Sequence, residues 1–116
     1  MAKEIKKRAI TITEKGGSFS TFFHRIKGSK KNSGISSLRS LLSNEKARLL
    51  HICKTKKPLS IYELSKLLGR DFKAVRKDIK LLEQFGLIEL ISSIKQGRER
   101  LRPVVDADQL IITLNL

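Results

Sequence analysis

The sequence has little cysteine, few acidic residues and no long apolar run. Its single cysteine, Cys53, excludes an internal disulfide and a zinc site built from several cysteines. No apolar stretch approaches the roughly 20 residues of a membrane-spanning helix, and the basic segment MAKEIKKRAITIT lacks the apolar core of a signal peptide. We therefore expect a cytoplasmic protein with no membrane partner, in which Cys53 is an ordinary apolar helix residue.

Acidic residues are outnumbered by basic ones. The 116-residue chain has 11 Asp and Glu against 25 Lys and Arg, which gives a formal net charge of +14. Solubility alone requires a much smaller net charge. The excess predicts a polyanionic partner, and the length predicts one compact domain with one hydrophobic core.

Side chains typical of catalysis or metal binding are also scarce. His24 and His51 are far apart in the sequence, and no Ser-His-Asp, metal-ligand or phosphate-cradling motif is present. We expect a protein that is not an enzyme, with no catalytic residues, no metal site and no cofactor.

The first third of the chain predicts a short strand, a short helix and a flexible linker. Residues 5–13 are rich in β-branched side chains, with Ile10 and Ile12 on one strand face. After a glycine pair, the segment SFSTFFHRI has apolar residues at helical spacing. These are Phe19, Phe22, Phe23 and Ile26. Residues 28–37 are small, polar and lysine-rich, which is typical of a linker.

Three helices with clear start and stop signals are predicted next. Ser43 can cap the first, and Pro58 stops it. Ser60 and Glu63 have the spacing of a capping box at the start of the second, which ends at Gly69. The apolar positions of these two helices are Ala47, Leu50, Ile52 and Cys53, and then Ile61, Leu64, Leu67 and Leu68.

The third helix has the clearest period in the chain. Asp71 can cap it, and Gly86 can supply the left-handed residue that ends it. Its predicted buried stripe is Phe72, Val75, Ile79 and Leu82. That stripe leaves basic side chains on the remaining faces of the helix.

Three strands are predicted to follow. Residues 87–91 and 101–105 are apolar and β-branched, and Gly97 lies in a charged segment between them, so they predict a hairpin with a basic tip. The last segment, QLIITLNL, places alternate apolar residues on one face. These are Leu110, Ile112, Leu114 and Leu116, a pattern that fits pairing with the N-terminal strand or with another subunit.

Together these elements predict an α+β fold of the winged helix-turn-helix type. It has a three-helix core and a β-hairpin wing, with strand extensions at both ends. Residues 1–34 form the N-terminal extension, and residues 35–116 form the winged helix domain with its C-terminal strand. In such a motif the third helix, residues 72–85, enters the DNA major groove and the wing contacts the backbone.

The predicted DNA-binding residues lie in three groups. On the third helix they are Lys73, Ala74, Arg76, Lys77 and Lys80. In the turn and second helix they are Ser60, Tyr62 and Arg70, and in the wing they are Lys95, Arg98 and Arg100. Asp78 has two interpretations: it pairs with Arg70 or a lysine one turn away, or it accepts a hydrogen bond from a cytosine amino group.

The segments LLSNEKARLLHI, PLSIYELSKLLGRDFKAVRKDIKLLEQFGLIEL and RPVVDADQLIITL resemble winged-helix regulators of the MarR-like type. They are especially similar to a family of small prokaryotic putative DNA-binding regulators. The most specific part is GRDFKAVRKDIKLLEQFGLI, and the resemblance covers roughly residues 35–116. It implies a homodimeric transcriptional regulator that binds double-stranded DNA without a cofactor.

Two other functions fit the same residues. One is the DNA-binding antitoxin of a toxin-antitoxin pair, which holds a toxin protein and represses its own synthesis; the resemblance also implies this role. The other is a basic RNA-binding protein, because winged helices also bind RNA and net charge does not distinguish the two nucleic acids. Repression of transcription is the outcome we expect of DNA binding.

Overall fold

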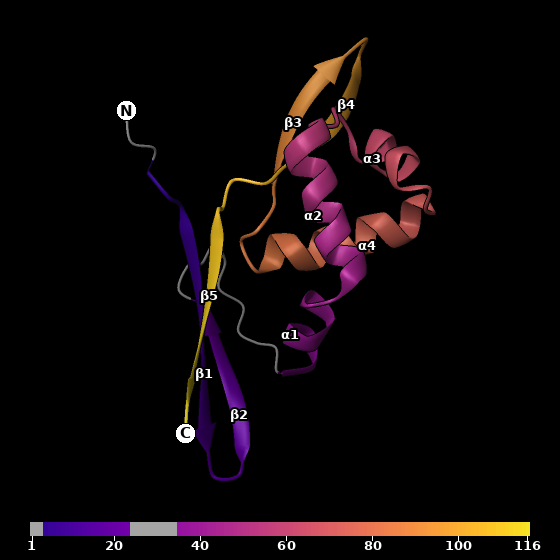
Figure 1. Ribbon diagram of the computed structural model, residues 1–116. Coiled ribbons are helices and arrows are strands. Elements are labelled where there is room, and N and C mark those ends of the chain that lie inside the picture. The colour runs from indigo at the N-terminus through magenta and orange to yellow at the C-terminus, as the bar shows by residue number, and fades with distance from the viewer. Residues whose placement is uncertain (1–3, 24–34) are drawn as a thin grey trace.

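The computed structural model describes residues 4–23 and 35–116, which form a mixed α+β structure. The described elements, in chain order, are β1 (Lys7–Lys15), β2 (Ser18–Phe23), α1 (Ile35–Leu41), α2 (Asn44–Lys56), α3 (Ile61–Leu68), α4 (Phe72–Gln84), β3 (Glu89–Lys95), β4 (Arg98–Val104) and β5 (Gln109–Asn115). Figure 1 shows the helices beside a three-stranded sheet, with the β3–β4 hairpin projecting from the helical part. None of the described helices is long and apolar enough to cross a membrane.

The helix predicted for SFSTFFHRI is wrong over residues 18–23, which form β2. Gly16 and Gly17 both have positive φ, 61° and 92°, and they turn the chain back tightly after β1. β2 then pairs antiparallel with β1, with Phe19 opposite Glu14. The spacing of the aromatic residues fits a helix locally, but a neighbouring strand satisfies the same backbone groups once the glycine turn has formed. Ile26 and His24 lie outside the described residues.

The predicted linker is partly outside the described residues and partly helical. Nothing is described for residues 28–34, whereas residues 35–37 form the first turn of α1. α1 buries Leu38 and Leu41 in the core, and it packs against β2. These two leucines at helical spacing supply the apolar anchor that the small polar residues before them lack.

The N-terminal and C-terminal strands meet in one sheet with the order β2-β1-β5. β1 pairs parallel with β5, with Ile10 opposite Ile112 and Ile12 opposite Leu114. This confirms the N-terminal strand as a partner of the last strand. Ile10 and Ile12 are buried in the same cluster as the helices, so one face of the sheet covers the helical core.

α2 begins at the N-cap Ser43, whose side chain accepts a hydrogen bond from the Lys46 amide, as predicted. The buried face of α2 matches the predicted one in part: Cys53 is buried, and Leu50 and Ile52 are partly buried against the core. Leu49 and Cys53 are buried together with Lys46, whereas Ala47 is exposed. Lys46 is buried where its ammonium pairs with a carboxylate on α4, and the helical spacing in α2 gives no sign of this long-range pairing.

The β3–β4 hairpin turns at Gln96 and Gly97, which both have positive φ, 55° and 76°. Two adjacent residues with positive φ are typical of the type I′ turn, whose twist matches that of the flanking strands. At the other end of the hairpin, Leu87, Ile88 and Pro103 are buried. The hairpin is therefore anchored at its base, and all of residues 91–100 are exposed.

Candidate nucleic-acid interface

The second and third predicted helices are α3 and α4, joined by a short turn. The Ser60 hydroxyl accepts a hydrogen bond from the Glu63 amide at 3.0 Å, and the Glu63 carboxylate accepts one from the Leu59 amide at 2.6 Å. These two bonds satisfy amides at the start of α3 that have no partner inside the helix. Gly69 has a φ of 66° at the other end, and its left-handed conformation allows α4 to start three residues later. The start of α3 and its exit are both as predicted.

The rotation of α4 is fixed by its cap and its buried stripe. Asp71 accepts hydrogen bonds from the amides of Lys73 and Ala74 at 3.0 and 3.3 Å. Val75, Ile79 and Leu82 are fully buried, as predicted. The other predicted member of this stripe, Phe72, is 38% exposed, because it occupies the first turn, where α4 extends beyond the core. Leu67, expected to be buried on α3, is likewise exposed.

The exposed face of α4 is strongly basic. With the buried stripe on one side, the predicted contact residues lie on the solvent side, and Ala74 is half-buried between them. The exposed members are Lys73, Arg76, Lys77 and Lys80. Within residues 4–23 and 35–116, no ion pair neutralises any of the four. This face of α4 therefore presents four uncompensated positive charges.

Asp78 is turned away from that basic face into an ion-pair network. Its Oδ2 accepts a hydrogen bond from Arg70 Nη1 at 2.9 Å, and its Oδ1 lies 3.2 Å from Lys46 Nζ. Arg70 Nη2 also lies 3.8 Å from Glu45 Oε1. Pairing with Arg70, the first of the two interpretations of Asp78, is confirmed. The guanidinium of Arg70 is held between two carboxylates, so its contribution is to fix the turn between α3 and α4.

Ser60 and Tyr62 lie at the start of α3. The Ser60 hydroxyl is occupied as the helix cap, so its contribution to the site is structural. The Tyr62 side chain is 59% exposed, and Lys66 Nζ lies 5.0 Å from the centre of its ring. A cation over an aromatic ring is attracted by the ring quadrupole. Lys66 was not predicted as a site residue, although it stands four residues after Tyr62, one helical turn away.

One face of the β3–β4 hairpin carries a row of cations. Lys95 is opposite Arg98, Ser93 is opposite Arg100, and Ile91 is opposite Arg102 in the antiparallel register. Because directly opposite residues share a face and alternate residues of a strand do too, these side chains all lie on one face. The cations of this basic row are the predicted Lys95, Arg98 and Arg100, together with Arg102, which was not predicted. The sequence signal that could have identified Arg102 was its spacing, because Arg98, Arg100 and Arg102 stand at every second position.

The opposite face of the hairpin faces the protein near its base. Leu101 and Pro103 lie on it and are half-buried and buried. Glu99 is on this face too, where its Oε2 accepts a hydrogen bond from Ser92 Oγ at 2.6 Å. Glu99 is thereby separated from the arginines, whereas Glu89, opposite Val104, lies at the base of the face that carries the basic row. No ion pair joins the basic row to any described residue.

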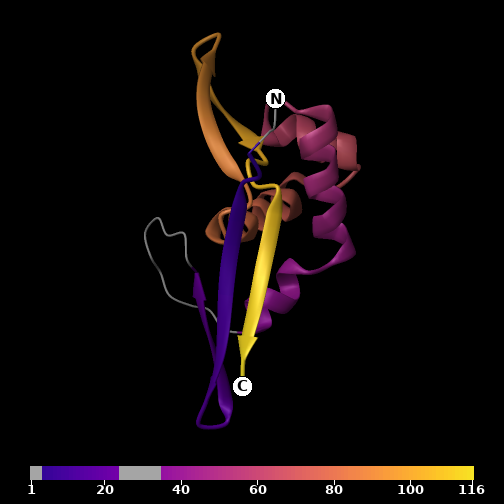
Figure 2. The same ribbon diagram turned by 60° about the vertical axis from the view of Figure 1, so that its left-hand side comes forward.

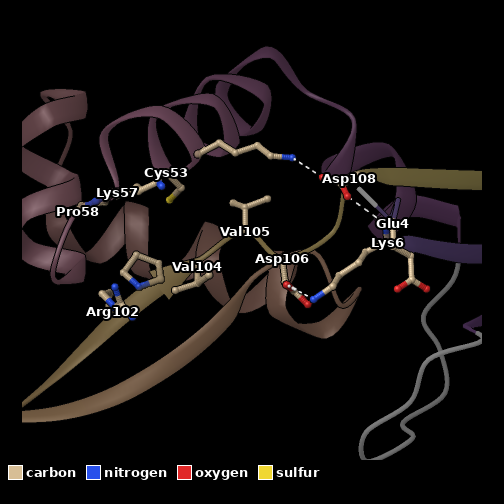
Figure 3. A pocket seen from close by; sticks show the side chains of 12 residues that line it. Glu4, Lys6, Cys53, Lys57, Pro58, Arg102, Val104, Val105, Asp106 and Asp108 are labelled. Carbon is tan, nitrogen blue, oxygen red and sulfur yellow. Dashed lines mark hydrogen bonds and ion pairs between the residues drawn. The ribbon is translucent and has the colours of Figure 1, made fainter. Parts of the chain in front are cut away.

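A cavity of about 480 Å³ lies where α2 approaches the segment between β4 and β5 (Figure 3). Two ion pairs line it: Lys6 Nζ to Asp106 Oδ1 at 3.0 Å, and Lys54 Nζ to Asp108 Oδ1 at 3.3 Å. Cys53 also lines it, and burial raises the pKa of its thiol from 9.0 to about 12. The thiol therefore stays protonated and unreactive at neutral pH. Lys57 and Arg102 line it as well, and neither has an ion pair among the described residues.

Metal-ligating side chains do not gather in the described part of the chain, which has no group of three or more His, Cys, Asp or Glu. His51 is exposed on α2.

The comparison with known families matches residues 41–112 to the HVO_A0114 family model. The chain belongs to the HVO_A0114 family. No curated protein matches it. The match runs from the last residue of α1 into β5, so the HVO_A0114 region includes α2, α3, α4 and the basic hairpin. β1 and β2 lie outside it. The family match does not bear on the MarR-like resemblance, which stays a prediction.

Proposed function

We propose that this protein is a winged helix-turn-helix regulator that binds double-stranded DNA. In this proposal α3 and α4 are the helix-turn-helix, α4 lies in the major groove, and the β3–β4 hairpin is the wing. The observation that carries the proposal is the distribution of charge. The cations of α4 and of the basic row are exposed and unpaired among the described residues, while Asp78 on α4 and Glu99 on the hairpin are bonded away from them.

The two basic surfaces have different roles in this proposal. α4 is held rigidly by its cap and its three fully buried residues, so side chains on its outer face can meet base edges in a fixed register. The hairpin is exposed from Ile91 to Arg100, and its long cationic side chains suit phosphate contacts, which give affinity without sequence information. Ion pairing of Arg70 and Asp78 sets the angle between α3 and α4.

Repression is the simplest consequence of such binding, because a protein that occupies a promoter excludes other proteins from it. The proposal also places the chain in the cytoplasm, where a prokaryotic chromosome is accessible. Duplex DNA is favoured over single-stranded RNA because single-strand binders stack bases on exposed aromatic side chains. The exposed aromatic residues include Phe19, Tyr62 and Phe72, which are scattered over β2, α3 and the start of α4.

A selection from a pool of random duplex DNA tests the proposal, at about 0.15 M salt so that non-specific phosphate binding is partly screened. We expect one sequence motif to be enriched, and the selected duplex to bind at least about 1,000-fold more tightly than a scrambled one. A matched selection uses the triple variant Lys73→Ala, Arg76→Ala, Lys77→Ala, which should enrich no motif. Equal affinity for all duplexes, or tighter binding to single-stranded or duplex RNA, would contradict the proposal.

A further inference from the structure

The outer edge of β5 is the most apolar exposed feature of the described chain. β5 is an edge strand of the β2-β1-β5 sheet, so one row of its backbone N–H and C=O groups has no strand partner among the described residues. Such an edge is a template for pairing with another strand. Figure 2 shows β5 along the border of the sheet, with its end directed away from the hairpin.

The side chains of β5 do not protect this edge. Natural edge strands are usually guarded by charged residues, proline or a bulge. β5 has the sequence QLIITLN, without a charge or a proline, and its register with β1 is unbroken from Gln109 to Asn115. Large apolar residues of this terminal segment are exposed: Ile111, Ile112, Leu114 and Leu116.

We infer that β5 pairs antiparallel with β5 of a second copy of this chain, forming a continuous six-stranded sheet. The symmetry axis passes beside Ile112, the middle residue of the strand, so that Ile112 lies opposite its counterpart. Leu110 then lies opposite Leu114 of the partner subunit, and Ile111 opposite Thr113 of the partner subunit. All seven residues pair, and the apolar side chains on each face gain a neighbour from the partner strand.

Charge favours a second copy as the occupant of this edge. Two chains of net charge +14 repel each other wherever their cations meet. Residues 103–116 contain no Lys or Arg, so copies can approach along this segment without that repulsion. Uncharged apolar residues at the centre are also typical of homodimer interfaces.

The other strand edges are less suited to self-pairing. β3 carries a charge at each end, Glu89 and Lys95, which β5 lacks. β2 is the opposite edge of the same sheet, and α1 packs against it. β4 carries Arg98, Arg100 and Arg102, whose like charges oppose a neighbouring copy. Pairing β5 with β5 has the further property that the contact is closed by one two-fold axis, so it stops at a dimer instead of growing into a fibre.

The two-fold axis also fixes where the two α4 helices lie in the dimer. This part of the inference rests on the proposed function. The two-fold axis of an antiparallel strand pair is perpendicular to the sheet, so the same face of both sheets points the same way. The face that carries Ile10 and Ile12 covers the helical core in each copy. Both helical units, each with its α4, therefore lie on one side of the six-stranded sheet, as binding to a palindromic duplex requires.

Sedimentation equilibrium of the full chain without DNA tests the inference. We expect a dimer at about 10 µM and a monomer for Leu114→Lys, whose ammonium would be buried opposite Leu110 of the partner subunit. The dissociation constant should rise by about 100-fold or more. Leu114 is 52% exposed in the single chain, so the variant should keep its fold, which circular dichroism checks. The control is Ile94→Lys on the hairpin, which should stay dimeric.

Cross-linking tests the register. The Cα atoms of directly opposite residues in an antiparallel pair are about 4.5 to 5.5 Å apart, within disulfide range. Ile112→Cys should form a disulfide-linked dimer on mild oxidation, and Thr113→Cys, whose counterpart is offset by two residues, should link at least about ten times more slowly. The unchanged chain is the background, since Cys53 is buried.

A monomeric full chain, a dimer that survives Leu114→Lys, or faster linking through Thr113→Cys would overturn the inference. Neither assay contains DNA. A failure of the inferred dimer would therefore say nothing about DNA binding, which the selection from random duplex DNA tests separately.

Discussion

Arg70 Nη1 donates a hydrogen bond to Asp78 Oδ2 at 2.9 Å, and this bond joins the turn after α3 to the middle of α4. Both side chains are largely buried, as is Lys46, which lies 3.2 Å from the other carboxylate oxygen. One carboxylate thus compensates two cations from α2 and the turn. The pair orients α4 relative to the elements around it and keeps the Asp78 carboxylate away from the cations on the outer face of the helix.

Removing this carboxylate should destabilise the fold. Asp78→Ala leaves Lys46 without a counter-charge and Arg70 with Glu45 alone at 3.8 Å, where the two cationic side chains are 10% and 21% exposed. Breaking a buried ion pair in this way costs about 3 kcal/mol of unfolding free energy. Urea unfolding followed by circular dichroism measures it. The control Glu83→Ala removes an exposed carboxylate from the same helix and should change the unfolding free energy by less than about 0.5 kcal/mol. Equal effects of the two variants would contradict the role given to Asp78.

A second connection joins the sheet to the helical part. Arg8 on β1 donates from Nε to the Gly86 carbonyl at 3.0 Å, and its Nη2 lies 3.5 Å from Asp106. Its side chain is largely buried. We expect Arg8→Met to lower the unfolding free energy by about 2 kcal/mol, because it leaves a carbonyl and a carboxylate without this charged donor. Lys7→Met, an exposed neighbour, is the control, and thermal unfolding of the two variants should separate them clearly. Identical midpoints would show that Arg8 does not hold the sheet in place.

Cys53 should be unreactive in the folded protein. Burial raises its pKa to about 12, so the thiolate fraction at pH 8 is far smaller than in the unfolded chain. Labelling with a thiol reagent should be at least about 100-fold slower in buffer than in urea. The same shift makes the folded state hold its proton between pH 9 and about 12 while the unfolded state loses it, so stability should fall as pH rises through that window. Rapid labelling of the native chain at pH 8 would contradict the buried position.

The helices from α2 to α4 were predictable because their signals are local. Ser43, Ser60 and Asp71 each cap the helix that follows, and a cap needs no partner more than three residues away. The apolar stripe of Val75, Ile79 and Leu82 then correctly predicted which face of α4 is buried. The cations of α4 were placed on the solvent side for the same reason.

The features that the sequence did not predict depend on distant residues. The phenylalanines of β2 have helical spacing. The segment is nevertheless a strand, because the glycine turn brings it beside β1, with which it pairs antiparallel. Lys46 is buried because Asp78 is nearby, more than 30 residues further along the chain. Lys95 joins the arginines of β4 on one face through the register of β3 with β4, which no single strand reveals.

The central claim is that α4 distinguishes bases while the basic row of the hairpin contacts phosphates. It is tested most directly by titrating variants against the selected duplex and single-substituted duplexes at several salt concentrations. Arg98→Ala with Arg100→Ala should weaken binding to all duplexes alike, and the salt slope should shrink by about 0.9 for each phosphate that is no longer neutralised. Arg76→Ala or Lys77→Ala should cost about 1 to 3 kcal/mol and relax discrimination at one or two base positions.

The control for both sets is Arg39→Ala on α1, at the other end of the helical part from the hairpin (Figure 1), which should leave affinity and salt slope unchanged. If the α4 variants lose affinity uniformly over all duplexes while the hairpin variants change base preference, the hairpin reads the sequence and the assignment of α4 is contradicted.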